Sequence, residues 1–213
     1  AGYAAMWNAY SDHLASEFPG TVPVALWTSE PNVFIMKDHV IRKPSDLAGL
    51  KVRVAGATAA DVATALGATP VQMPINQVYN ALQTGLIDGV ITGSSTLNDF
   101  KLDEVANSYT FGANLGRLSF YAVMNKKKYD SLSAEHRAAL DSVRGMPLSK
   151  SAEDAWNETA IEGVAAARLL DDNTFVDLTE AEAAAFAAAI APVTGAYVDA
   201  VGGQAAQAAM QAK

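Results

Sequence analysis

The sequence contains no cysteine, and this absence excludes several kinds of site. Among its 213 residues no disulfide, thiolate nucleophile or zinc–thiolate site is possible. Positive charge is also scarce, because 15 Lys and Arg stand against 23 Asp and Glu, for a net charge of −8. That balance argues against nucleic acid and against an anionic membrane surface as partners. No run approaches the ~20 apolar residues of a membrane span, and no signal peptide is visible.

Recognisable catalytic groups are missing as well. The three histidines, His13, His39 and His136, stand beside polar or charged residues and show no triad or metal-ligand spacing. No phosphate-binding glycine pattern occurs between residues 49 and 56. The run 171–173, Asp-Asp-Asn, lacks the spacing of a calcium loop. We therefore expect no metal, no cofactor and no enzyme activity, which favours a binding protein.

The stretch 44–93 is the best-defined part of the chain. Short apolar runs alternate in it with two helical patterns, one of about 59–66 beginning after Thr58 and one opened by Pro74 and closed by Gly85. A β-α-β-α-β unit with such short connections predicts a parallel sheet with right-handed crossovers. The predicted strands are 51–54, 70–73 and 87–91.

One residue of this unit departs from the pattern. Arg53 lies between Val52 and Val54 in a strand whose inner positions should be apolar or paired. A guanidinium keeps its proton, and burial without an anion is costly. Arg53 therefore lies in water on an edge strand, forms an internal salt bridge, or faces a ligand carboxylate at the carboxyl edge of the sheet, where open α/β sheets bind ligands.

Four segments in order resemble the solute-binding proteins of tripartite ATP-independent periplasmic (TRAP) transporters, the DctP-like family. The most specific is Val78-Tyr79-x-Ala81-Leu82-Gln83-x-Gly85-x-x-Asp88-Gly89. The others are Pro44-x-Asp46-Leu47-x-Gly49-Leu50-Lys51-x-Arg53, Leu66-Gly67-Ala68-x-Pro70-Val71-x-Met73 and Met124-Asn125-Lys126-x-x-Tyr129-x-x-Leu132-Ser133. The resemblance spans nearly the whole chain and implies that the family's N-terminal third has no counterpart here.

The resemblance implies an α/β fold of the periplasmic-binding-protein type, with two lobes, parallel-rich sheets flanked by helices, and a long helix common to both lobes. Residues 1–30 would be the remnant of lobe I and 31–117 would form lobe II. Residues 118–158 would return to lobe I, and 159–213 would supply C-terminal helices to lobe II. It also implies a periplasmic receptor that binds a small organic acid, works as a monomer, and delivers the acid to TRAP membrane permease subunits.

For the ligand site, the resemblance implies a carboxylate bound by Arg53. Trp27 and Tyr79 would flank the apolar part of the ligand, and Thr92, Ser94 and Asn114 would contact its remaining oxygens. Other readings stay open, because Trp27 also suits a core position and Ser94 or Ser95 suits a helix cap. Many relatives carry a second arginine near Asn32, which this chain lacks. An enzyme or a sensory ligand-binding domain on the same scaffold is the alternative function.

The remaining segments give weaker patterns. Apolar spacing predicts a helix over residues 1–18, and Phe120–Met124 reads as an uninterrupted strand buried in a parallel sheet. A long helix is expected from about Ser149 to Leu170, with Ile161 on its buried side. The alanine-rich segment 179–211 is predicted helical, with a capping box from Thr179 to Glu182 and a break or kink at Pro192 and Gly195. Further strands are predicted at 22–27, 33–36 and 109–111.

Overall fold

The chain forms two compact units in the computed structural model, which describes residues 1–211. Unit 1 contains residues 1–29, 118–156 and 198–211, and unit 2 contains 30–117 and 157–197. The chain therefore leaves and re-enters each unit, and its strands lie in two separate sheets. The sequence predicted 159–213 as part of the second lobe, whereas the structure groups residues 198–211 with unit 1.

Unit 2 is built on a six-stranded sheet whose strand order is β4-β3-β5-β2-β6-β8. Only β2 runs against its neighbours, since it pairs antiparallel with both β5 and β6, while β3, β4 and β5, and likewise β6 and β8, pair in parallel. The carboxyl ends of five strands therefore lie at the same edge of the sheet. The strands are β2 (Asn32–Met36), β3 (Lys51–Val54), β4 (Thr69–Gln72), β5 (Gly89–Gly93), β6 (Ser108–Phe111) and β8 (Thr174–Asp177).

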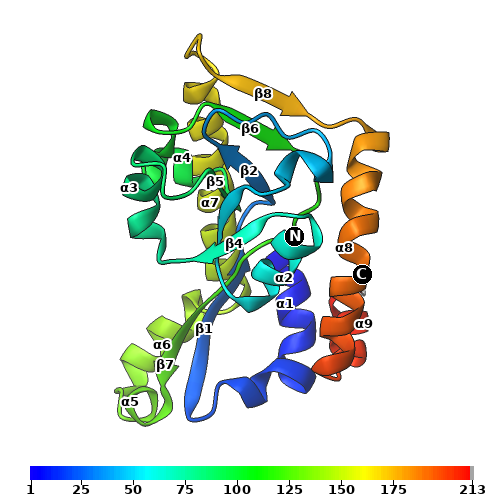
Figure 1. Cartoon of the computed structure of the whole chain (residues 1–213). Helices are drawn as coiled ribbons and strands as arrows, with labels where there is room; N and C mark the ends of the chain where they lie inside the picture. The colour runs from blue at the N-terminus through cyan, green and yellow to red at the C-terminus, as the bar shows by residue number, and fades with distance from the viewer. Residues whose placement is uncertain (212–213) are drawn as a thin grey trace. The chain divides into compact units, whose positions relative to one another are not determined.

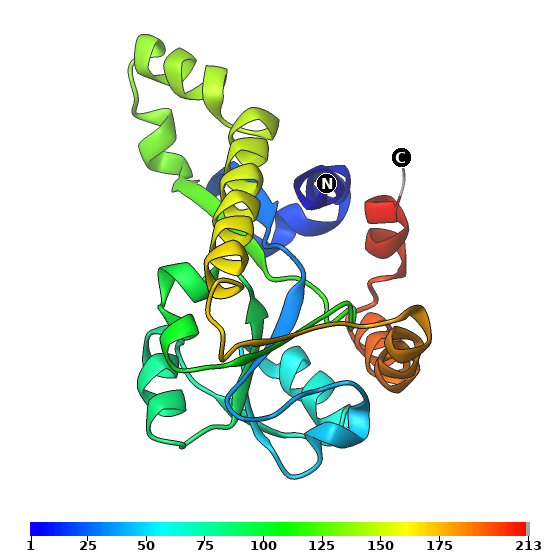
Figure 2. The same cartoon turned by 90° about the horizontal axis from the view of Figure 1, so that it is seen from above.

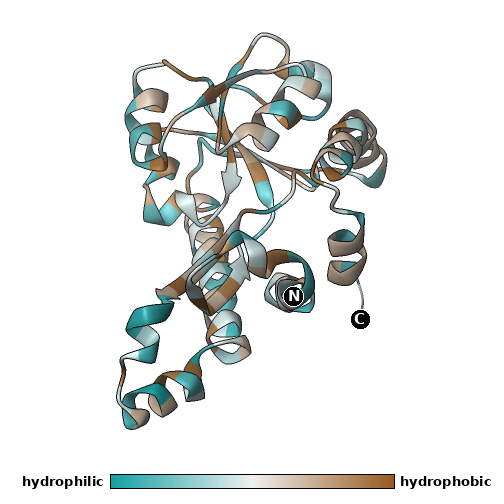
Figure 3. Cartoon of the chain, turned by 90° about the horizontal axis from the view of Figure 1, so that it is seen from below, coloured by the Kyte–Doolittle hydropathy of each residue, from teal (hydrophilic) through white to brown (hydrophobic). Residues whose placement is uncertain are grey.

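Helices cover both faces of this sheet, as Figure 2 shows for α2 on one side and α3 and α4 on the other. On one face, α2 and α8 pack their apolar residues around Phe34, Val52 and Ile91. On the opposite face, α3, α4 and the end of α7 pack around Ile35 and Val90. Figure 3 shows hydrophobic residues concentrated on these strands. The helices are α2 (Ala57–Ala65), α3 (Val78–Gln83), α4 (Thr96–Asp99), α7 (Met146–Ala167) and α8 (Glu180–Ala200), with 3₁₀ turns at Pro44–Leu47, Ile75–Gln77 and Leu102–Glu104.

Two details of unit 2 differ from the sequence prediction. Helix α2 begins at Ala57 after Gly56, whose φ of 86° is one that glycine adopts without strain, so Thr58 is not its cap. Strand β8 was missed because its four residues, Thr174–Asp177, directly follow a polar turn and are too few to show a clear period.

Unit 1 contains a two-stranded antiparallel sheet of β1 (Thr21–Thr28) and β7 (Ser119–Asn125), visible in Figure 1. The prediction of a buried parallel strand at Phe120–Met124 was wrong: β7 alternates between exposed and half-buried residues, and Tyr121 is 58% exposed. Around the sheet lie α1 (Gly2–Ala9), a π-helix (Tyr10–Leu14), a 3₁₀ turn (Ala15–Glu17), α5 (Lys126–Asp130), α6 (Ala134–Val143), the first part of α7, and α9 (Gln204–Gln211).

Helix α7 belongs to both units, beginning in unit 1 and ending in unit 2. It starts at Met146, earlier than predicted, because Pro147 occupies its first turn, where the missing N–H costs nothing. Ile161 was predicted to be buried but is 70% exposed.

Helix α8 runs without a break from Glu180 to Ala200 and contains Pro192 in its interior, contrary to the predicted interruption. It is also long and apolar enough to cross a membrane, by length and composition alone, which corrects the statement that no segment approaches such a span. Alanine supplies most of this apolar character. Phe186 and Ile190 anchor the helix in the core of unit 2, and its amino end is polar, so we interpret it as a surface helix of that unit.

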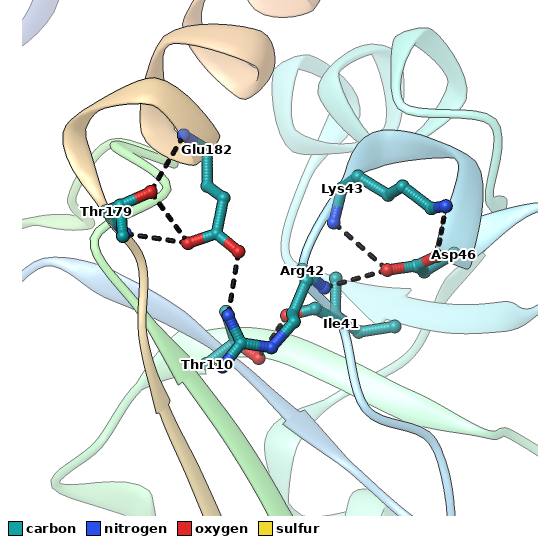
Figure 4. Close-up of polar contacts among 7 residues, drawn as sticks. All are labelled: Ile41, Arg42, Lys43, Asp46, Thr110, Thr179 and Glu182. Carbon is teal, nitrogen blue, oxygen red and sulfur yellow. Dashed lines mark hydrogen bonds and ion pairs between the residues drawn. The ribbon is translucent and has the colours of Figure 1, made fainter.

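The amino end of α8 is held by the predicted capping box (Figure 4). Thr179 N–H donates to Glu182 Oε2 at 2.8 Å, and Glu182 N–H donates to Thr179 Oγ1 at 3.3 Å. Arg42 Nη1 donates to Glu182 Oε1 at 2.7 Å from the segment before β3. These contacts, first the Thr179 backbone and then Arg42, hold the pKa of Glu182 below its usual value.

The lowered pKa of Glu182 predicts a pH-dependent contribution to the stability of unit 2. Because the folded-state pKa lies below the unfolded one, the stabilisation is present above the unfolded pKa and is lost as the pH falls through the folded one. Glu182→Gln should therefore unfold at lower urea than the parent at pH 7, and the difference should shrink by pH 3. Circular dichroism of the helices should report it, with the exposed Glu180→Gln as control. A difference of the same size at both pH values would contradict the prediction.

Candidate functional site

The carboxyl ends of β3, β4, β5, β6 and β8 meet at one edge of the unit 2 sheet. The amino end of the antiparallel strand β2 lies at this edge too, since Asn32 pairs with Gly93. Helices and loops that follow parallel strands leave backbone groups and polar side chains there, and open α/β sheets bind ligands at that edge. Arg53, Ser94 and Asn114 all come from strand ends or loops at this edge.

Arg53 is the most unusual residue of the edge. It is only 5% exposed, and its Nε donates to the Met73 carbonyl oxygen at 2.9 Å. No carboxylate within residues 1–211 lies at ion-pair distance from it, and its burial lowers the pKa of the guanidinium. Arg53 also lines a shallow hollow of about 380 Å³ with Gly56, Gln72 and Pro74. The side chain is thus a buried cation whose charge no carboxylate of residues 1–211 compensates.

Thr92 and Tyr79 lie on the same face of the sheet as Arg53. Arg53 is opposite Val90 on β5, and Thr92 follows two residues later, so side-chain alternation places both on one face. Thr92 is 2% exposed. Tyr79 on α3 packs against this face, but its hydroxyl donates to Glu104 Oε2 at 2.8 Å. That hydrogen bond raises the pKa of Tyr79 and gives its hydroxyl a partner other than a ligand.

Ser94 follows β5 and is 5% exposed. The residue at the amino end of α4 is Ser95, whose N–H donates to Glu30 Oε1 at 2.6 Å, so a carboxylate from before β2 caps this helix. A Cβ at position 93 would overlap the Glu30 carboxylate, so a larger residue there would displace that side chain. The Ser94 hydroxyl is therefore not used as the helix cap.

A cavity of about 560 Å³ opens at the same edge beside β2 and β6. Its floor and walls are mostly apolar, and its polar groups include Asn32, Ser94 and Asn114. Asn114 lies in a loop with a φ of 52°, which is uncommon for a residue other than glycine. The cavity is lined by Glu30, Pro31, Asn32, Val33, Ser94, Phe111, Gly112, Asn114, Asn157, Ala160, Ile161, Val164, Ala165 and Arg168.

Sequence reasoning found Ser94 and Asn114 but missed Asn157 and Ile161 on α7 and Arg168 directly after it. They lie more than forty residues beyond Asn114 in the chain, and no motif marks them. Arg53 and Tyr79 do not line this cavity, although Arg53 is at the same edge. Within residues 1–211 no group of three His, Asp or Glu side chains is placed to hold a metal ion.

Trp27 belongs to unit 1 and not to the unit that holds the other five predicted site residues. Its ring stacks on Phe120 with centroids 5.7 Å apart and lies 6.1 Å from Trp156. Its buried Nε1 has no hydrogen-bond partner among the residues that the structure describes. The alternative reading of Trp27 as a core residue thus has direct support from these ring contacts, and a ligand role for it remains a prediction.

Comparison with known proteins places these features in a family. Residues 5–199 match the family described as bacterial extracellular solute-binding protein, family 7 (DctP). The C4-dicarboxylate-binding periplasmic protein DctP of Rhodobacter capsulatus is 28% identical over 191 residues, which are 88% of this chain and 56% of the relative. The chain spans about half the length of the curated relatives it matches.

Solved structures agree with this match. A TRAP solute-binding protein from Rhodoferax ferrireducens in complex with benzoate superposes with a TM-score of 0.90 at 27% identity, covering 98% of this chain and 66% of the other. One from Bordetella bronchiseptica with bound mandelate gives a TM-score of 0.87 at 27% identity, covering 97% and 68%. These neighbours are binding proteins of transport systems rather than enzymes, and they share the periplasmic-binding-protein fold. The chain belongs to bacterial extracellular solute-binding protein family 7.

Proposed function

We propose that this chain is the ligand-binding part of a periplasmic receptor that binds a small organic acid through Arg53. The observation that carries the proposal is the burial of Arg53, at 5% exposure, with no carboxylate of the described residues at ion-pair distance. A permanent cation in such a place is stabilised by an anion. A ligand carboxylate supplies one and matches the planar fork of the guanidinium in a bidentate pair.

The relatives support the carboxylate class. The three relatives described above bind a C4-dicarboxylate, benzoate and mandelate, all of them carboxylates. The polar residues at the same sheet edge, Thr92, Ser94 and Asn114, would then contact oxygen atoms of the ligand. In the proposed role the loaded receptor delivers the acid to membrane permease subunits of a TRAP transporter, as the family resemblance implies.

A ligand screen tests this function. Native mass spectrometry of the purified 213-residue chain, followed by calorimetry with a panel of mono- and dicarboxylates, should detect a small acid that binds at micromolar strength and is recovered unchanged. Conversion of the acid to a product would favour the enzyme alternative instead. Binding of only uncharged or cationic solutes would contradict the assignment of Arg53 as the carboxylate partner.

A further inference from the structure

The cavity beside β2 and β6 is predominantly apolar, and this property restricts the ligand. Val33, Phe111 and Ile161 contribute aliphatic and aromatic surface from three different elements, β2, β6 and α7. Pro31, Ala160 and Val164 add to the same surface. Ligand sites of this kind derive most of their affinity from buried apolar area, and a few polar groups fix the orientation of the ligand.

The charged residues of the cavity disfavour a second carboxylate on the ligand. Glu30 is 5% exposed and keeps its carboxylate against the amino end of α4. Among residues 1–211, Arg168 is the one cation in the lining, and its guanidinium already lies 4.3 Å above the Phe175 ring and 3.5 Å from Asp177 Oδ2. A second anionic group would therefore meet the negative charge of Glu30, and Arg168 already contacts another carboxylate, that of Asp177.

The cavity lining is neutral at Asn32 and at the residue beside it. The residue beside Asn32 in the cavity lining is Val33, an apolar side chain that is 4% exposed. Asn32 itself is 7% exposed, and its Oδ1 has no hydrogen-bond partner among residues 1–211. An apolar body carrying one hydroxyl is thus compatible with this end of the cavity, since Asn32, Ser94 and Asn114 offer neutral polar groups.

The sheet sets the distance between the cavity and Arg53. Strand β3, which carries Arg53, is separated from β2, which carries Val33, by β5 alone. Adjacent strands are ~4.8 Å apart, so β3 and β2 lie about 10 Å apart. Both side chains project from the same face of the sheet, because Val33 pairs with Thr92 and Arg53 with Val90. A ligand that reaches both would place its carboxylate toward β3 and its apolar body toward β2 and β6.

We propose that this cavity receives the apolar body of the ligand, and that the receptor selects monocarboxylates with a compact apolar body, such as a single aromatic ring, over dicarboxylates and sugar acids. This inference rests on the proposed function, because Arg53 binds the one carboxylate. Calorimetry of the 213-residue chain should therefore show benzoate and mandelate binding at least about tenfold more tightly than succinate and glucuronate.

A substitution of Ile161 tests the apolar contact between the cavity and the ligand. It lines the cavity and is 70% exposed, so Ile161→Ser should leave the fold intact. The loss of three carbon atoms from the contact should weaken the binding of benzoate about tenfold. The affinity for succinate should change little. Leu169→Ser is the control, since Leu169 is 83% exposed and lies outside the cavity lining, and both ligands should bind as they do to the parent.

The outcomes separate this inference from the proposed function. If succinate or glucuronate binds as tightly as benzoate, or if Ile161→Ser binds benzoate like the parent, the inference is wrong. If Arg53→Lys weakens the binding of every acid in those same experiments, the proposed function stands even though the inference fails. If no carboxylate binds to the parent chain, or if Arg53→Lys leaves binding unchanged, the proposed function itself fails and the inference fails with it.

Discussion

Arg53→Lys should weaken carboxylate binding by about tenfold or more, corresponding to ~1.4 kcal/mol per decade. Lysine keeps the positive charge, but its ammonium cannot present two parallel N–H groups to both oxygens of a carboxylate. Its single nitrogen would also have to serve both the ligand and the Met73 carbonyl oxygen, to which Arg53 Nε donates at 2.9 Å. Calorimetry with the best acid from the ligand screen measures the difference directly.

Arg53→Ala extends this test by removing the charge. Binding should weaken further, while the melting temperature of the ligand-free protein should stay near that of the parent, because no carboxylate of the described residues pairs with Arg53. Arg42→Lys is the control: Arg42 is in the same unit, but its side chain is 55% exposed and pairs with Glu182. A ligand-free Arg53→Ala protein that melts far below the parent would show a structural role for Arg53 instead.

The βαβαβ unit was predictable because its connections are short and marked by residues of restricted or unusual conformation. Gly67 and Gly85 both adopt positive φ, and Pro74 precedes the 3₁₀ turn that leads into α3. The alternation of elements then fixed the parallel pairing of β3, β4 and β5. The strand Lys51–Val54, with Arg53 as its one charged inner residue, needed no tertiary information to be identified.

The rest depended on contacts that a single sequence does not show. An apolar run such as Phe120–Met124 has the same composition whether it is buried on both faces or pairs, as β7 does, with only β1 among the described strands. The cavity was not predictable because Ile161 on α7, and Arg168 directly after this helix, come to the end of β6 only in the fold. Likewise, Glu30 could not be recognised as the cap of α4, because it lies sixty-five residues before Ser95, whose N–H donates to it.

Glu153→Ala should destabilise unit 1 by about 3 kcal/mol or more. Glu153 lies on α7 and is 5% exposed. Its carboxylate accepts hydrogen bonds from the N–H groups of Gly2 at 2.9 Å and Tyr3 at 2.7 Å, at the amino end of α1. It also accepts from the Thr28 N–H at 3.3 Å and the Thr28 hydroxyl at 3.2 Å, at the end of β1. One buried side chain thus holds three elements of unit 1 together.

Removal of Glu153 leaves these donors without their charged acceptor, and the cost of an unsatisfied buried donor is ~1–3 kcal/mol. Glu153→Gln should lose roughly half as much stability. One carbonyl oxygen still accepts hydrogen bonds, while the amide NH₂ faces N–H groups and cannot accept from them. Glu158→Ala is the control, since Glu158 is exposed on the same helix and should change stability by no more than ~0.5 kcal/mol.

Urea unfolding followed by tryptophan fluorescence isolates the effect of Glu153, because all three tryptophans, Trp7, Trp27 and Trp156, lie in unit 1. The fluorescence midpoint should fall in the order Glu158→Ala, Glu153→Gln, Glu153→Ala. Ligand affinity at Arg53, which belongs to unit 2, should be measured alongside it as a separate readout. Equal midpoints for Glu153→Ala and Glu158→Ala would mean that these four hydrogen bonds contribute nothing net, and that packing alone holds α1 and β1 to α7.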